Sequence, residues 1–233
     1  SGADYAKIGV GRSTGTKLIS ASGHIKNPGV YEIELGLSVY EFMNSDEYLG
    51  GMSSDRPLKA FVPGGSSVPI LPANLIYKTA AGEDRLMTYE SLSDGGFATG
   101  SMLGSGGFIV YNDTSCIVRN TWNFSRFYHH ESCGQCTPCR EGTGWLEKVL
   151  HRIENGHGRE EDIDLLLSIQ SKIEGNTICP LGDAASWPVA AAIRHFRDEF
   201  EYHIRFPEKI KNRDHCVAEP FEQVKHLVGK VTV

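Results

Sequence analysis

Three cysteines lie at C-x₂-C-x₂-C spacing, at positions 133, 136 and 139, and a fourth, Cys179, stands directly before a proline. A [4Fe–4S] cube takes four thiolate ligands, and this set supplies four. Gaps of two residues let one tight loop provide three ligands, with backbone N–H groups free to bond the cluster sulfides. The fourth thiolate must then come from elsewhere in the fold. The pattern therefore predicts a cluster held by Cys133, Cys136, Cys139 and Cys179.

Other readings of these cysteines fit the spacing less well. A structural zinc site usually uses two separated C-x₂-C pairs. A disulfide framework is typical of small secreted chains, and this chain has 233 residues and no visible signal-peptide pattern. A radical-type C-x₃-C-x₂-C motif is excluded because the first gap here is two residues. Zinc remains the main alternative to iron–sulfur.

Two further cysteines lie outside the motif. Cys116, within Ser115-Cys116-Ile117-Val118, is expected to be a small buried apolar residue. Cys216 follows His215, but one thiol and one imidazole without partners rarely form a site, so this pair is expected to be incidental.

Composition limits the function classes. The chain is 40% hydrophobic and 22% charged, which is ordinary for a globular protein of one large or two small domains. A net charge of −6 argues against nucleic acid or an anionic membrane as the main partner. No apolar run approaches the roughly 20 residues of a membrane-spanning helix. The cysteines are expected to reside in a reducing compartment.

Two glycine-rich stretches resemble nucleotide-binding loops without their context. The stretch 9–15 lacks the last spacing and the following helix of a dinucleotide fingerprint, so residues 1–15 are expected to form a flexible N-terminal loop. Gly64-Gly65 precedes no helix whose N-terminus could bind a phosphate, so a tight turn is expected there.

Residues 16–92 are predicted to form a small mixed module. A hairpin is expected over 18–22 and 30–35, a helix over 38–43 with Ser38 as N-cap, and a strand over 58–62. This order is typical of a β-grasp fold. Residues 93–120 are predicted to connect it to the next part, with a buried strand over 108–111.

From 121 to 206 the pattern is helical. Helices are expected over 124–131, 141–154, 159–174 and 183–204, with Asp183 capping the last. Short connections would make neighbours antiparallel, so the Cys179 loop returns to the end that holds the cysteine triplet. The sequence predicts an α+β protein: a β-grasp module, then a four-helix bundle, then an extension over 207–233. The predicted inner faces are Trp145, Leu146, Val149, Leu150 and Ile153; Ile163, Leu166, Leu167, Ile169 and Ile173; Val189, Ile193, Phe196, Phe200 and Ile204.

The segments 132–143 and 177–184 resemble a known family, the 51 kDa or F-type, NADH-oxidising flavoprotein subunits of respiratory complex I. The stretches 15–18, 22–24, 28–31 and 63–67 look like the soluble-ligand-binding-β-grasp (SLBB) module of that family, and 102–107 like the segment that leads into its iron–sulfur domain.

The resemblance implies a role in electron transfer rather than bond chemistry by side chains, so no catalytic residue is assigned. In the family, FMN and NADH bind a Rossmann-like domain with a Gly-Arg-Gly-Gly signature, N-terminal to the β-grasp module. That signature does not occur here, so the chain is expected to be the C-terminal portion of such a protein, with residues 1–15 as a remnant of the missing domain. On its own, this portion is expected to have little activity towards NADH. Pro180 and Leu181 are expected to wall the flavin pocket. The residues expected around the cluster are Ser132, Gly134, Gln135, Thr137 and Arg140. Arg140 is expected either to stabilise the reduced cluster by its positive charge or to form a surface ion pair with Glu141 or Glu147.

The resemblance also implies partners. These are the 24 kDa (E-type, [2Fe–2S]) and 75 kDa (G-type) subunits of the peripheral arm, on the cytoplasmic face of a bacterial inner membrane or the matrix side in mitochondria. The diaphorase subunit of a soluble NAD-linked hydrogenase or formate dehydrogenase shares these motifs and remains an alternative. A non-redox interaction module with zinc or a structural cluster is the alternative from another class.

Overall fold

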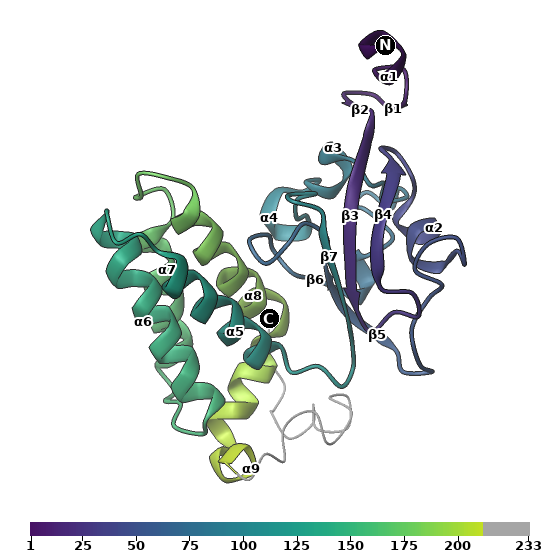
Figure 1. Cartoon of the computed structure of the whole chain (residues 1–233). Helices are drawn as coiled ribbons and strands as arrows, with labels where there is room; N and C mark the ends of the chain where they lie inside the picture. The colour runs from purple at the N-terminus through teal and green to yellow at the C-terminus, as the bar shows by residue number, and fades with distance from the viewer. Residues whose placement is uncertain (212–233) are drawn as a thin grey trace. The chain divides into compact units, whose positions relative to one another are not determined.

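The computed structural model describes residues 1–211, without the side chains of residues 97 and 98, and divides the chain into two compact units (Figure 1). The sheet unit covers Ser1–Asn112, and the helical unit begins at Asp113. The incidental pair predicted at Cys216 lies outside the described residues, as does most of the predicted C-terminal extension.

The sheet unit is built on a five-stranded mixed sheet of order β4-β3-β7-β5-β6. The pairs are antiparallel except β3 and β7, which run parallel. The five strands are β3 (Thr16–Gly23), β4 (Gly29–Glu34), β5 (Leu58–Val62), β6 (Leu71–Pro72) and β7 (Gly107–Asn112). The hairpin predicted from the alternating pattern is the β3–β4 pair, with Lys17 opposite Ile33.

Short helices surround this sheet. Helix α2 (Val39–Asn44) begins as predicted, with the Ser38 side chain accepting a hydrogen bond from the N–H of Glu41 at 3.0 Å. Its Phe42 enters the core and meets the ring of Phe108 from β7 edge to face, with centroids 5.3 Å apart. The remaining short helices are α3 (Tyr89–Leu92), α4 (Gly96–Thr99) and the 3₁₀ helix η1 (Ala73–Leu75).

Strand β7 corrects the predicted domain boundaries. The segment 93–120 was expected to be a connector, but β7 lies inside the sheet and pairs with both β3 and β5. A central strand needs a neighbour on each side to satisfy its backbone N–H and C=O groups. It therefore belongs to the sheet unit, and the division falls after Asn112 instead of at 92 and 120.

The glycine-rich segments take defined backbone paths. Residues 1–15, expected to be a loop, contain α1 (Gly2–Tyr5) and a hairpin of β1 (Gly9–Val10) with β2 (Ser13–Thr14). At Gly64, an added Cβ would lie 2.3 Å from the carbonyl oxygen of Met102, so only glycine allows this backbone approach. The Gly64-Gly65 pair thus serves chain packing, consistent with the predicted turn.

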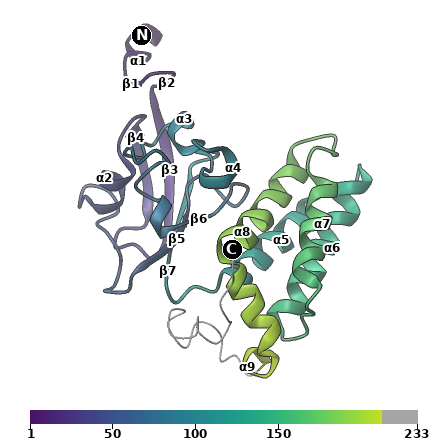
Figure 2. The ribbon, with the colours of Figure 1, turned by 180° about the vertical axis from the view of Figure 1, so that it is seen from behind.

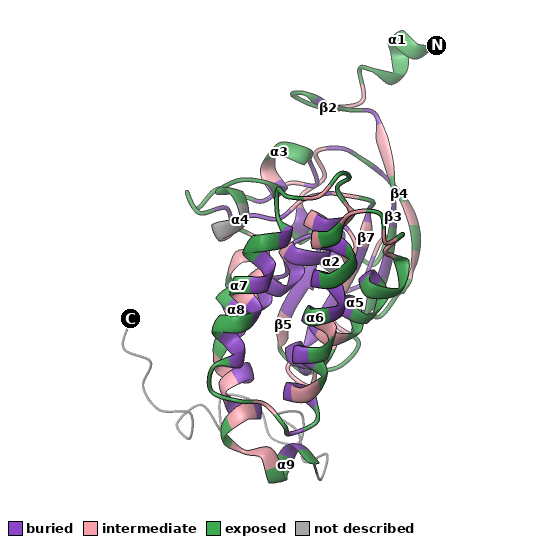
Figure 3. Ribbon diagram, turned by 90° about the vertical axis from the view of Figure 1, so that its left-hand side faces the viewer, coloured by how far each residue is buried: buried purple, intermediate pink, exposed green. Residues whose placement is uncertain are grey.

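The helical unit consists mainly of four long helices, seen from both sides in Figures 1 and 2. Helix α5 packs on α6 and α8, α6 also packs on α7 and α8, and α7 packs on α8. The buried sides of these helices face inward in Figure 3. The helices are α5 (Ile117–Glu131), α6 (Thr137–Glu154), α7 (Asp162–Ile173), α8 (Leu181–Arg205) and the short α9 (Pro207–Lys211).

Most predicted inner-face residues are buried, with exceptions at the edges of the stripes. Trp145 is 53% exposed and lines a groove of about 600 Å³ between α6 and α7, together with Leu165. It lies one position before Leu146, so it falls at the margin of an apolar stripe whose centre is Leu146, Val149 and Ile153. Leu167 and Ile204 are only half-buried.

Two helix starts also differ from prediction. Helix α5 begins at Ile117, with Cys116 as its N-cap, rather than near residue 124. Helix α8 has Pro180 as N-cap, and Asp183 lies in its first turn. Asp183 instead accepts a hydrogen bond from the N–H of Gly175 at 2.7 Å, which ties the end of α7 to the start of α8. Helix α8 is kinked at Phe196.

Among residues 1–211, no helix has both the length and the apolar character needed to cross a membrane.

Candidate metal centre

The cysteine triplet lies where α5 passes into α6. Ser132 is the C-cap of α5 and Cys136 is the N-cap of α6, so 132–136 form a short loop between two helix ends. Pro138 occupies the first turn of α6, where a missing N–H costs nothing. Helix α6 starts four residues earlier than predicted and therefore holds Cys139 in its first turn.

The Arg140 side chain fastens this loop. Its Nη1 donates to the carbonyl oxygen of Gly134 at 2.9 Å, and its Nη2 lies 3.4 Å from Thr137 Oγ1. Gly134 has φ +74°, a left-handed conformation that glycine adopts without strain. Arg140 also pairs with Glu141 through Nε at 3.0 Å. The predicted pair of Arg140 with Glu141 is thus present, whereas Glu147 accepts from Trp122 Nε1 instead. The stabilisation of a reduced cluster by Arg140 stays a prediction.

Cys139 is the most protected thiol of the four, at 6% exposure. Its Sγ lies 3.2 Å from Ser132 Oγ, and the Thr143 hydroxyl donates to its carbonyl oxygen at 2.7 Å. Burial raises the pKa of the Cys139 thiol, Ser132 partly opposes this, and the thiols at 136, 179 and 133 raise the pKa further. All three other cysteines of the motif therefore lie close enough to act on Cys139.

Cys179 reaches this place from the loop between α7 and α8. Figure 1 shows that this loop and the α5–α6 loop lie at the same end of the helical unit. The Thr177 hydroxyl donates to the carbonyl oxygen of Cys179 at 2.8 Å. An added Cβ on Gly182 would lie 2.4 Å from the Thr177 side chain, so this glycine permits the loop's tight fold. This placement agrees with the prediction that the Cys179 loop lies at the same end of the helices as the cysteine triplet.

The donor set itself agrees with a cluster. Three thiols come from the α5–α6 loop and the first turn of α6, and the fourth comes from the α7–α8 loop. A [4Fe–4S] cube takes four thiolate ligands, and this set supplies four.

Comparison with known proteins agrees with this interpretation. Residues 119–203 match the family described as the NADH-ubiquinone oxidoreductase-F iron-sulfur binding region. This segment contains all four cysteines of the motif. The match thus falls within the helical unit.

Similarity extends beyond this region. In Rickettsia typhi, the F-type subunit of NADH-quinone oxidoreductase is 44% identical over 209 residues, which is 89% of this chain and 45% of the relative. Its counterpart in Mycobacterium bovis is 43% identical over 86% of this chain and 42% of its own length. The chain is thus related to these F-type proteins and spans less than half the length of either.

Solved structures give a consistent fold. An NAD⁺-reducing [NiFe]-hydrogenase in its H₂-reduced state matches with a TM-score of 0.70 and 28% identity, over 87% of this chain and 31% of that chain. Its air-oxidised form matches with a TM-score of 0.71 and 25% identity, over 94% of this chain and 36% of that chain. The α+β class expected from sequence is confirmed.

The other predicted site residues lie at the surface of the two loops. Gln135, Thr137 and Pro180 are exposed, and Leu181 is half-buried. Exposed positions beside the cysteines leave these loops accessible to another domain or subunit. The wall of a flavin pocket predicted for Pro180 and Leu181 stays a prediction.

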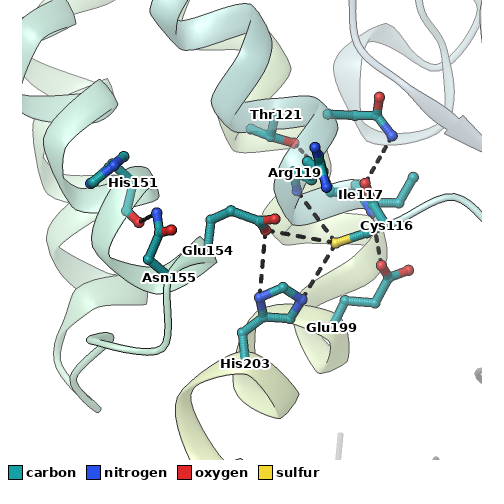
Figure 4. A network of polar contacts seen from close by, with 10 residues as sticks. Cys116, Ile117, Arg119, Thr121, His151, Glu154, Asn155, Glu199 and His203 are labelled. Atoms are coloured by element: carbon teal, nitrogen blue, oxygen red, sulfur yellow. Dashed lines mark hydrogen bonds and ion pairs between the residues drawn. The ribbon is translucent and has the colours of Figure 1, made fainter. Parts of the chain in front are cut away.

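Sequence reasoning missed a second group of donor side chains. Cys116, Glu154 and His203 come together inside the helical unit from three different segments (Figure 4). Cys116 is buried as expected, but its neighbours are polar. The one sequence signal is Glu199 and His203, four residues apart on an otherwise apolar side of α8.

Proposed function

We propose that this chain holds a [4Fe–4S] cluster through Cys133, Cys136, Cys139 and Cys179 and serves as a one-electron relay in an NADH-oxidising assembly. The observation that carries the proposal is the gathering of these four thiols at one end of the helices that match the oxidoreductase-F iron–sulfur region. When bound, such a cluster accepts and donates single electrons at a potential that the protein adjusts.

The chain's own groups have defined tasks in this role. The four cysteines supply thiolates, and the buried environment of Cys139 limits the access of water. Ser132 Oγ, next to Cys139 Sγ, offers a hydrogen bond that stabilises the thiolate. Arg140 fixes the loop through Gly134 and brings a positive charge that favours a more negative, reduced cluster.

The wider reaction rests on the similarity to the F-type proteins. Electrons would come from FMN after its reduction by NADH. FMN and NADH would be bound by a nucleotide-binding domain, whose signature this sequence does not contain. From the cluster, electrons would continue towards quinone through clusters of the E-type and G-type subunits. The chain would then be the C-terminal portion of an F-type protein, with Pro180 and Leu181 facing the flavin. Its place would be the peripheral arm, on the cytoplasmic or matrix side of the membrane.

The finer fold assignment follows the same reasoning. A β3–β4 hairpin, the capped helix α2 and further strands follow the order of a β-grasp module, which supports the SLBB assignment. The pairwise packing of α5, α6, α7 and α8 supports a four-helix bundle around the cluster loops.

The hydrogenase likeness supports a second candidate, the diaphorase subunit of a soluble NAD-linked enzyme. Purification from the native cells under mild conditions separates the two. Copurification with E-type and G-type subunits and membrane components supports complex I, and copurification with a [NiFe]-hydrogenase pair supports the alternative.

The cluster itself is tested by measuring the iron, sulfide and zinc content of the protein. Anaerobically purified chain should contain about four irons and about four acid-labile sulfides, with Cys116→Ala as a matched cysteine variant that leaves both counts unchanged. Stoichiometric zinc without sulfide in the motif would instead favour the non-redox module and overturn the proposal.

A further inference from the structure

We propose that the helical unit contains a second, separate metal site, in which Cys116, Glu154 and His203 bind one Zn²⁺ ion. The three donors lie on different segments: the N-cap of α5, the end of α6 and the last turns of α8. An ion here would join three helices at a place distinct from the cysteine motif.

The two distances from Cys116 Sγ to the other donor atoms are close to those around a tetrahedral ion. Cys116 Sγ lies 3.4 Å from His203 Nε2 and 3.9 Å from Glu154 Oε2. Zinc bonds of about 2.3 Å to sulfur and about 2.1 Å to nitrogen or oxygen place such donors about 3.6 Å apart. The three side chains converge in Figure 4, and their ligand atoms all lie within 4.8 Å of one another.

Burial of the whole donor set favours a cation among these side chains. Cys116 is 4% exposed, Glu154 6% and His203 0%. A buried carboxylate carries a desolvation cost that a nearby positive charge offsets. Zn²⁺ would supply that positive charge.

The start of α5 offers a hydrogen bond to the sulfur. Cys116 caps α5, and the N–H of Arg119 donates to its Sγ at 3.4 Å. A helix N-terminus stabilises a negative charge placed there. N–H groups that donate to a ligating sulfur are common around bound metals.

Glu199 completes the charge balance. Its Oε2 accepts a hydrogen bond from the N–H of Ile117 at 2.9 Å, which holds the start of α5 against α8. With Glu199, Glu154 and a Cys116 thiolate, three negative charges would face the two of Zn²⁺ and the one of Arg119. Glu199 acts here as a positioning residue beside the ligand set.

A cysteine–histidine–glutamate hydrogen-bond relay is the other interpretation of the same three side chains. His203 Nδ1 lies 3.6 Å from Glu154 Oε2, which is long for a hydrogen bond. A reactive cysteine also needs access to its substrate, and Cys116 is buried. The burial of Cys116 agrees with metal binding, which needs converging donors and no access for a substrate. Binding of one ion by all three side chains uses a single ring nitrogen of His203, Nε2, on the side that faces Cys116.

The experiment measures zinc in the cluster-loaded chain, expressed with zinc in the medium and dialysed against zinc-free buffer. About one zinc per chain is expected, with an X-ray absorption spectrum at the zinc edge that fits one sulfur and several nitrogen or oxygen neighbours. His203→Gln and Cys116→Ser should each reduce zinc to background with iron and sulfide unchanged. His157→Gln, which changes a histidine outside the donor set in the same unit, should keep the zinc.

Three results would overturn the proposal. They are zinc at background in the unmodified chain, zinc retained in both ligand variants, and a spectrum with three or four sulfur neighbours, which would place zinc in the cysteine motif. Because the zinc edge is read separately from iron and sulfide, failure of this site and failure of the cluster assignment are distinguishable.

Discussion

The four cysteines of the motif are not equivalent, because Cys139 is buried while Cys133 and Cys179 are exposed. Cys139 sits in a helix turn held by Thr143, whereas Cys179 is carried by a loop closed by Thr177 and Gly182. An exposed ligand on a loop is the one that a cluster loses with least disturbance to the fold.

The first prediction concerns that exposed ligand. Cys179→Ser should abolish the [4Fe–4S] cluster or convert it to a three-iron form, because one corner of the cube loses its thiolate. Iron and sulfide analysis with EPR of the oxidised protein measures the change, with Cys116→Ser as a control that keeps the cluster. An unchanged iron count and spectrum in Cys179→Ser would remove this residue from the ligand set.

The second prediction uses the Arg140–Glu141 pair. Arg140→Gln should lower the reduction potential of the cluster by tens of millivolts, because a positive charge that stabilises the reduced form is lost. Glu141→Gln should shift the potential upward by a smaller amount. Redox titration followed by EPR gives both values. Equal potentials in the parent and both variants would show that Arg140 acts only in holding the loop.

At this scale the sequence was informative for the motif cysteines and offered only the Glu199–His203 spacing for the second site. The motif cysteines are close in sequence and followed by a Cys-Pro, so their chemistry could be predicted from spacing alone. Cys116, Glu154 and His203 are far apart in the chain and meet only through helix packing.

At the scale of elements, the packing of α6 on α7 positions the triplet relative to the Cys179 loop. Gly142 lies one turn beyond Cys139, and an added Cβ there would be 2.6 Å from Ile173 of α7. The close approach of these helices therefore depends on the missing side chain.

The third prediction follows from that contact. Gly142→Leu should destabilise the helical unit by about 2 kcal/mol through overpacking, and should weaken cluster retention because the two loops move apart. Thermal unfolding and iron content measure these effects. Lys148→Leu, which places the same side chain at an exposed position of α6, should change stability little. Equal melting temperatures for both variants would contradict the packing argument.

The periodic pattern predicted the existence of these helices but not their ends. Helix α6 begins at Thr137, with Pro138 in its first turn, where proline is favoured. This signal is present in the sequence but was overlooked because it lies inside the cysteine motif. Trp145 was expected inside, and its exposure shows that a stripe drawn from every apolar residue is too wide.

At the scale of the whole molecule, the chain consists of two units with separate cores. The sheet unit has its own core around Phe42, Phe61 and Phe108, and all four motif cysteines lie in the helical unit. The hairpin of the sheet unit could be predicted from alternation. The apolar run over 108–111 also indicated a buried strand, but its pairing with β3 and β5 could not be predicted, because it is set by contacts distant in sequence.

The fourth prediction separates the two units. Removing the cluster with a chelator under oxidising conditions should increase amide hydrogen exchange in 128–145 and 173–185, since the cluster crosslinks those loops. Exchange in β3, β4 and β5 should stay the same. Hydrogen exchange with mass spectrometry, before and after removal, gives both results. A uniform increase across both units would contradict separate cores.

The central claim is that these four cysteines hold a redox-active cube, and EPR of the anaerobically purified chain tests it most directly. Reduction with dithionite should produce a fast-relaxing S = 1/2 signal with g values of about 1.9–2.05, as in other cubane clusters, from a protein that is EPR-silent when oxidised. A protein that contains its full iron and sulfide yet gives no signal on reduction, or that contains zinc in their place, would contradict the account.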